Sequence, residues 1–293
     1  MEQDNRKNYT LGIICIIASA FCFSLMSLFI RLSGDVPVIQ KCFFRNVVAM
    51  LIAIGAMVKS KQPFRIGEGN FKYLLIRAIG GTIGVICNYY AIDHMAISDA
   101  SILNKLSPFF AIIFSVFVLK EIANRYEWLA VAVAFIGAMF VVKPTFSLEI
   151  IPALAGVISG CGAGLAYTYV RKLGMRGENS MIIVLFFSTF STLCTLPFLI
   201  FNYAPMTFKQ WIFLLLCGVS AAGGQIFITK AYSYAPAKEI SVYDFSNVIF
   251  SAILGFIFLE QIPDWLSVLG YVIIISTAVV KWYYSIKAVH EME

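Results

Sequence analysis

The chain has 293 residues, of which 60% are hydrophobic and only 13% are charged. Soluble globular domains carry about 25% charged residues, so this composition excludes an ordinary soluble protein. The formal net charge of +6 is spread over short polar segments between apolar runs, which argues against a basic surface for nucleic acid.

Apolar runs close to the ~20 residues that cross a bilayer recur along the chain. They lack the strict alternation of membrane β-strands, so we predict helices. The expected spans lie at 10–32, 37–58, 70–92, 98–119, 127–143, 150–172, 180–202, 209–232, 239–259 and 264–285. The predicted fold class is therefore an all-α polytopic membrane protein with ten transmembrane helices, which leaves no room for a soluble catalytic domain.

The distribution of basic residues predicts the orientation. With the N-terminus inside, most of the 22 lysines and arginines fall at cytoplasmic ends of the spans, and the outer ends hold only Arg31, Lys41, Lys143 and Lys209. The positive-inside rule then places both termini in the cytoplasm, and we expect a multi-pass protein of the cell (cytoplasmic or inner) membrane. The first apolar run continues past Ala18-Ser19-Ala20, so we expect a span there and not a cleaved signal peptide.

Taken in chain order, the first and sixth spans share a pattern of small residues. A shift of 140 residues superposes Ala20 on Gly160, Ser24 on Gly164 and Arg31 on Arg171. Small residues four apart let helices pack closely in lipid. Glycine hinges that let these helices slide or bend are the alternative interpretation. The largely apolar fifth and tenth spans are expected on the outside of the bundle or against another copy.

Residues 91–121 and 231–260 also resemble each other. Each stretch leaves one apolar span, crosses a short polar break, enters another span and stops at a glutamate. The interpretation is an internal repeat, with domains at 10–143 and 150–285. Five spans per repeat is an odd number, so the second repeat is inverted. Inverted repeats place a substrate site near the middle of the membrane and provide two alternating conformations.

Five ionisable residues fall inside predicted spans: Arg45, Arg77, Lys105, Lys230 and Asp244. Each costs about 2.5 kcal/mol or more unless it faces a cavity or a partner. Lys105 and Asp244 hold matching repeat positions, so we predict an ion pair across the pseudo-two-fold axis. That pair either faces a cavity or is purely structural. Arg45 and Arg77 either contact substrate or brace helix ends, and Lys230 either contacts substrate or snorkels to the interface.

Amide and phenol side chains in the same spans complete the predicted site, because such groups orient a ligand within an apolar pocket. They are Asn88, Tyr90, Asn104, Tyr243 and Asn247. The four cations among the five ionisable residues outnumber the single carboxylate, which favours an anionic or zwitterionic ligand over a cationic drug. We expect Lys105, Arg45 and Arg77 to be the anion contacts. Tyr90, Asn88 and Tyr243 are expected to shape the pocket, and Asp244 to pair with Lys105 or to couple a proton.

Neither an enzyme nor a cofactor is indicated. The chain has two histidines and seven cysteines without a CxxC motif, and no nucleophile–base pair or phosphate-binding loop. We therefore expect no catalytic residue, no metal site and no cofactor. A lipid-modifying membrane enzyme is disfavoured on the same grounds.

Several short motifs give the chain a family resemblance: FFRN at 43–46, RAIGGTIG at 77–84, YYAI at 89–92, SDAS at 98–101, SPFF at 107–110, VFVLKE at 116–121 and GFIFLE at 255–260. With these the chain resembles the EamA-type ten-helix members of the drug/metabolite transporter superfamily. The resemblance implies two inverted five-helix repeats, a central cavity and alternating access. It extends to the branch that contains mammalian carboxylate-carrying relatives.

The functional expectation is a secondary transporter or facilitator for a small polar metabolite, anionic or zwitterionic and carrying a carboxylate. The alternatives are an exporter of amino acids or drug-like cations, and a lipid flippase or scramblase. The expected partners are a small-molecule substrate and the lipid bilayer, with a coupling proton and a homodimer as further candidates and no nucleic acid.

Overall fold

The computed structural model describes residues 2–61, 65–120, 125–142, 150–234 and 241–290, and these residues form helices joined by short turns. The helices are α1 (Glu2–Leu32), α2 (Val38–Lys59), α3 (Phe71–His94), α4 (Ile97–Asn104), α5 (Ser107–Val118), α6 (Arg125–Val142), α7 (Ile150–Met175), α8 (Ser180–Phe201), α9 (Phe208–Tyr234), the 3-10 helix η1 (Ser241–Phe245), α11 (Ser246–Leu259) and α12 (Trp265–His290).

The ten-helix prediction is confirmed. In the described ranges, nine segments are long and apolar enough to cross a membrane, and Tyr243–Leu259 is a shorter apolar helical segment. The fourth predicted span is interrupted between α4 and α5, and the ninth changes from the 3-10 helix η1 to the α-helix α11; we call both positions breaks. Pro108 stands in the first turn of α5, where its missing N–H and its ring prevent α4 from continuing as one straight helix. The equivalent break in the second repeat is η1.

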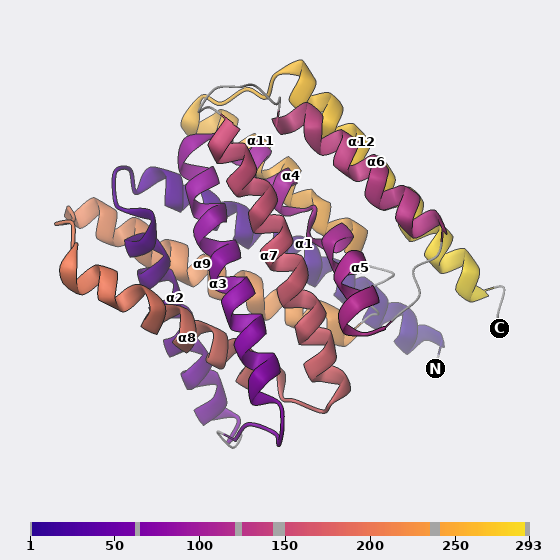
Figure 1. Cartoon of the computed structure of the whole chain (residues 1–293), viewed down its shortest axis with the longest axis horizontal. Helices are drawn as coiled ribbons and strands as arrows, with labels where there is room; N and C mark the ends of the chain where they lie inside the picture. The colour runs from indigo at the N-terminus through magenta and orange to yellow at the C-terminus, as the bar shows by residue number, and fades with distance from the viewer. Residues whose placement is uncertain (1, 62–64, 121–124, 143–149, 235–240, 291–293) are drawn as a thin grey trace.

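The helices of one repeat pack mainly against those of the other (Figure 1). Helix α1 lies along α9, and α3 lies along α7. Because α1 is equivalent to α7 and α3 to α9, the symmetry that relates the repeats converts one of these pairs into the other. Helix α2 pairs with its counterpart α8, and α6 pairs with α12 along one edge of the bundle. Within the described residues, most of the interior of the protein is therefore the interface between repeats.

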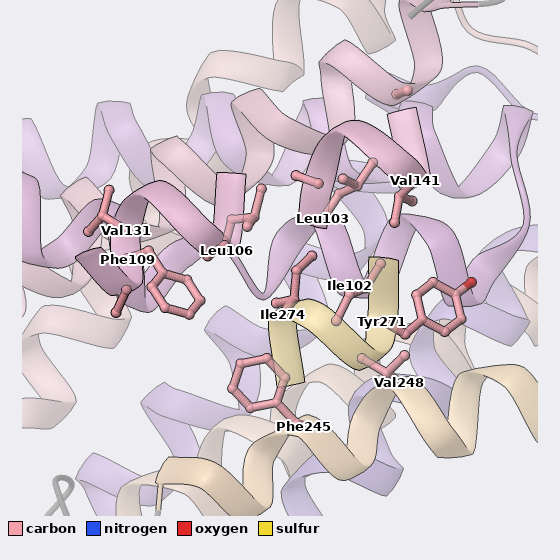
Figure 2. Packing of buried hydrophobic residues seen from close by; sticks show 14 of the residues in the cluster. Ile102, Leu103, Leu106, Phe109, Val131, Val141, Phe245, Val248, Tyr271 and Ile274 are labelled. Carbon is pink, nitrogen blue, oxygen red and sulfur yellow. The ribbon is translucent and has the colours of Figure 1, made fainter. Parts of the chain in front are cut away.

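The largest hydrophobic cluster holds the two broken helices together (Figure 2). Leu103 and Leu106 flank the α4–α5 break, and Phe245 and Val248 flank the η1–α11 break. Ile274 from α12 fills the space beside them. The polar residues at the two breaks are therefore brought close by apolar packing around them.

Glycines let α7 approach the α4–α5 break. A Cβ added at Gly160 would lie 2.7 Å from the carbonyl oxygen of Leu103, and one at Gly164 would lie 2.6 Å from Cβ of Phe110. No side chain fits at such distances. The small-residue stripe predicted in the sixth span is therefore a packing surface.

The equivalent contact of α1 with η1–α11 uses hydrogen bonds. The Asn247 amide donates to the Ala20 carbonyl at 2.9 Å and to the Ser24 hydroxyl at 2.7 Å. Ser24 donates in turn to the Asn247 carbonyl at 3.0 Å. Because Ser24 corresponds to Gly164, one repeat uses close packing where the other uses polar contacts.

We predict that Gly164→Ala lowers the melting temperature of the detergent-purified protein. The added methyl group overpacks the contact with α5, which costs about 1–3 kcal/mol. Gly174→Ala, in the same helix, is the matched control, because a Cβ there meets no heavy atom within 4 Å. Equal melting temperatures for the two variants would show that the α5–α7 contact tolerates a side chain.

Candidate functional site

A cavity of about 130 Å³ lies between the two repeats. It is lined by residues of α1, α2, α3, α4, α7, α8, α9, η1 and α11 and by the residue at the α4–α5 break. A volume of this size is many times the ~15 Å³ that one water needs. The cavity brings together seven of the ten predicted site residues: Arg45, Arg77, Asn88, Asn104, Lys105, Asp244 and Asn247.

The other three predicted residues lie outside the cavity. Tyr90 stacks on the ring of His94 with a centroid distance of 4.2 Å. Tyr243 packs edge-on against Trp282 at 6.5 Å, and Lys230 is exposed just beyond the apolar part of α9. Successive side chains of a helix point about 100° apart. These three side chains therefore point in other directions than the nearby residues that line the cavity.

The predicted ion pair between the repeats is present. Lys105 Nζ donates to Asp244 Oδ2 at 2.5 Å, and the two side chains are 11% and 18% exposed. The residues sit at the two helix breaks, which explains why they meet. Lys105 carries three N–H donors, and Asp244 Oδ1 is buried without a hydrogen-bond partner in the described part of the chain. Both groups therefore keep capacity for a ligand.

Two arginines lie against one aromatic ring in the cavity. The Cζ atoms of Arg45 and Arg77 are 5.7 Å and 3.8 Å from the ring centroid of Phe187. Arg45 Nη1 donates to Asn46 at 2.6 Å, and Asn46 donates to Ser191 at 2.7 Å. These two hydrogen bonds orient the Arg45 guanidinium group. Within the described residues, Nε of both arginines and Nη1 of Arg77 have no hydrogen-bond partner.

The charges of the lining do not balance. It contains the cations Arg45, Arg77 and Lys105 and the carboxylate of Asp244. Lys105 and Asp244 offset each other, and neither arginine forms a salt bridge with any residue that the structure describes. Among the described residues, the lining of the cavity therefore carries a net positive charge. No group of three or more His, Cys, Asp or Glu side chains is placed to bind a metal within the described ranges.

A second buried ion pair ties helix ends near the α1–α2 turn. Lys41 is fully buried and donates to both carboxylate oxygens of Asp93 at 2.7 Å. The Arg31 guanidinium donates to the carbonyls of Ile92 and Asp93. The first three helices are thereby joined at one end of the bundle. Sequence analysis assigned Arg31 and Lys41 to membrane orientation alone and did not single out Asp93.

Hydrogen bonds between the repeats reinforce the same end. The Gln40 side chain both donates to and accepts from the backbone of Ala204, at 2.9 and 3.0 Å. Gln210 donates to the Ser33 carbonyl at 3.1 Å, and Tyr271 donates to Asp99 at 2.5 Å.

The fold and the cavity define a polytopic membrane carrier: ten apolar helices in two inverted repeats, with broken helices meeting at a polar site. The model of the EamA-like transporter family matches residues 10–143 and 150–282. The chain therefore belongs to this family, within the drug/metabolite transporter superfamily, and it is a multi-pass membrane transporter.

Relatives from bacteria and mammals align along most of the chain. It is 30% identical to the pseudopaline exporter CntI of Pseudomonas aeruginosa, over 92% of this chain and 94% of that protein. It is 28% identical to human solute carrier family 35 member G1, over 94% of this chain and 81% of that one. A crystal structure at 16% identity superposes with a TM-score of 0.65, covering 92% of this chain and 96% of the other, and shows a shared fold.

We predict strong coupling between Lys105 and Asp244 in a double-mutant cycle of thermal stability. Lys105→Met or Asp244→Asn alone leaves a buried charge without its partner, at a cost of about 3 kcal/mol. The double variant removes both charges, so its loss falls well below the sum of the two single losses. Additive losses would show that the pair does not contribute as a unit.

Proposed function

We propose that this protein is a secondary transporter or facilitator that moves a small carboxylate-bearing solute across the membrane by alternating access. The observation that carries the proposal is the cavity between the repeats. There two arginines, which have no carboxylate partner among the described residues, lie alongside a cross-repeat ion pair. Hydrogen bonds between guanidinium and carboxylate groups are directional, and they are strong where water is excluded.

The lining residues have distinct roles in this proposal. Arg45 and Arg77 bind the carboxylate, and Lys105 contacts it with the donors that Asp244 leaves free. Asn88 orients a further polar group of the solute. Asn104 holds the cavity wall by donating to Ser159 at 3.1 Å. Asn247 also holds the cavity wall, through the hydrogen bonds that its amide donates to Ala20 and Ser24 of α1.

Asp244 is the group best placed to couple transport to a proton. A substrate anion at Lys105 competes with Asp244 for the same ammonium group. The substrate anion and Asp244 then share the positive charge of one lysine, and a proton on Asp244 leaves that charge to the substrate. Substrate binding and proton uptake would then occur together at one pair of residues.

The repeat architecture supports the alternating-access part of the proposal. The repeats 10–143 and 150–285 meet at the cavity, and hydrogen bonds join them near the α1–α2 turn. At the opposite end, Glu178 accepts from Asn70 at 2.9 Å and from the Gly67 N–H at 3.0 Å. A net contribution of about 1 kcal/mol for a typical hydrogen bond lets such contacts break in turn.

The location of the protein is part of the same proposal. We place it in the cell (cytoplasmic or inner) membrane with both termini in the cytoplasm. The start of α1 and the end of α12 lie at the same edge of the bundle in Figure 1, as an even number of spans requires. The exposed apolar residues of α6 and α12, among them Trp128, Ile136 and Val272, face lipid or a second copy in a homodimer.

The alternatives differ in their fit to the cavity. An amino acid could place its ammonium group at the free oxygen of Asp244, so export of a zwitterion is the second candidate, and the exporter among the relatives supports that direction. A drug-like cation meets two uncompensated arginines. A lipid headgroup must pass a cavity of only about 130 Å³, which disfavours a flippase or scramblase.

We predict that Lys105→Ala abolishes solute uptake in proteoliposomes that contain the same amount of folded protein as those of the unmodified chain. The variant removes an anion contact and leaves Asp244 unpaired in the cavity. The assay compares labelled carboxylates, amino acids, cations and a fluorescent lipid. Lys209→Ala is the matched control, because Lys209 is exposed near the start of α9.

Three outcomes would count against this assignment. Full carboxylate uptake by Lys105→Ala would remove Lys105 from the site. Transport of cations alone, or of the lipid alone, would overturn the proposed substrate class. Loss of uptake in Lys209→Ala would show that the assay responds to charge removal anywhere on the protein.

A further inference from the structure

The guanidinium groups of Arg45 and Arg77 both lie against the ring of Phe187, and we call this arrangement the arginine stack. Arg45 and Arg77 come from the first repeat, on α2 and α3, and Phe187 comes from α8 of the second. Each arginine is only 7% exposed, so both cations are held within the protein. An aromatic face offsets part of the charge of a guanidinium group but leaves its in-plane N–H donors unused.

Gly81 makes room for the stack. A Cβ at this position would lie 2.9 Å from the Phe187 ring and 3.1 Å from Nη1 of Arg77. Gly81 lies one helical turn after Arg77 on α3, on the side that lines the cavity. A larger residue would displace the ring or the guanidinium group, so the geometry of the stack depends on this glycine.

The number of uncompensated cations in the cavity indicates how many negative charges the ligand carries. Two like charges close together inside a membrane repel each other, and each needs a counter-charge. In the part of the chain that the structure describes, the only cavity carboxylate, Asp244, already offsets Lys105. A monocarboxylate would neutralise one arginine and leave the other uncompensated. A solute with two carboxylates neutralises both.

From this we infer that the cavity selects a dicarboxylate, with the arginine stack as its anion subsite. The inference rests on the proposed function and narrows its substrate class. Each guanidinium group takes a carboxylate in its plane, and the solute extends from the stack toward the Lys105–Asp244 pair. Lys105 contacts the nearer carboxylate with the N–H donors that Asp244 leaves free, and the free oxygen of Asp244 is available to the rest of the solute.

The test uses matched ligands on the unmodified purified protein. Succinate, its monoamide succinamate and butyrate share a four-carbon chain but carry two, one and one carboxylates, and malonate and glutarate vary the spacing. A ligand that binds the folded state raises its melting temperature by mass action. At least one dicarboxylate should stabilise the protein at a concentration about tenfold below that needed for its monoamide, as loss of one charged contact predicts.

Variants then locate the subsite. Arg77→Gln should weaken dicarboxylate binding about tenfold or more and reduce the preference over the monoamide to near one. Gly81→Ala should reduce the same preference while keeping every charge, which provides a second route if Arg77→Gln folds poorly. Arg77→Lys keeps the charge and should restore part of the preference. Lys209→Gln removes an exposed cation and should change nothing.

The outcomes separate this inference from the proposed function. If no dicarboxylate of the series stabilises the protein at a lower concentration than succinamate and butyrate do, the dicarboxylate inference is overturned and a carboxylate carrier remains. Retention of the dicarboxylate preference in both Arg77→Gln and Gly81→Ala overturns the arginine stack as its origin. Stabilisation by no carboxylate at all overturns the inference together with the proposed substrate class.

Discussion

An ionised side chain inside a membrane needs an opposite charge or access to water, and this requirement shapes the middle of the protein. The two broken helices each bring one charge to the same place, Lys105 from one repeat and Asp244 from the other. Broken backbone in a membrane must itself be buried in protein or line a cavity. The ion pair, the two helix breaks and the cavity thus all follow from the cost of unpaired charges and unpaired backbone groups in a membrane. Close packing of α7 on the α4–α5 break completes the burial.

Much of this arrangement could be predicted from the sequence because its signals are local or repeated. Apolar runs of bilayer length predict the helices, and internal similarity places Lys105 and Asp244 at matching positions of the two repeats. The polar interruptions in residues 91–121 and 231–260 correspond to real breaks. An odd number of spans per repeat then required inversion. These inferences require only the thickness of the bilayer and the odd number of spans in each repeat.

The parts that could not be predicted depend on how each helix is rotated. Tyr90 and Lys230 share helices with cavity residues but lie at other angles, and span limits uncertain by a few residues cannot fix that angle. Phe187 carried no signal, because a phenylalanine in an apolar span faces lipid as readily as a cavity. Lys41 and Asp93 lie near span ends, where charges are common, so only three-dimensional contact shows them to be a buried pair.

The unequal packing of the two repeats has a consequence for the kinetics of the protein. Under the proposed alternating access, movement of α7 over α5 would exchange van der Waals contacts at the glycines and break the hydrogen bonds that Thr168 and Lys172 donate to carbonyls of α5. Movement of α1 over α11 must break the hydrogen bonds of Ser24 and Asn247 before new ones form. Because the two contacts differ in chemistry, the opposite rearrangements of the two repeats in the proposed cycle would have different activation enthalpies. Temperature would then change their relative rates, so the slow step of that cycle can change on warming although the repeats share one architecture.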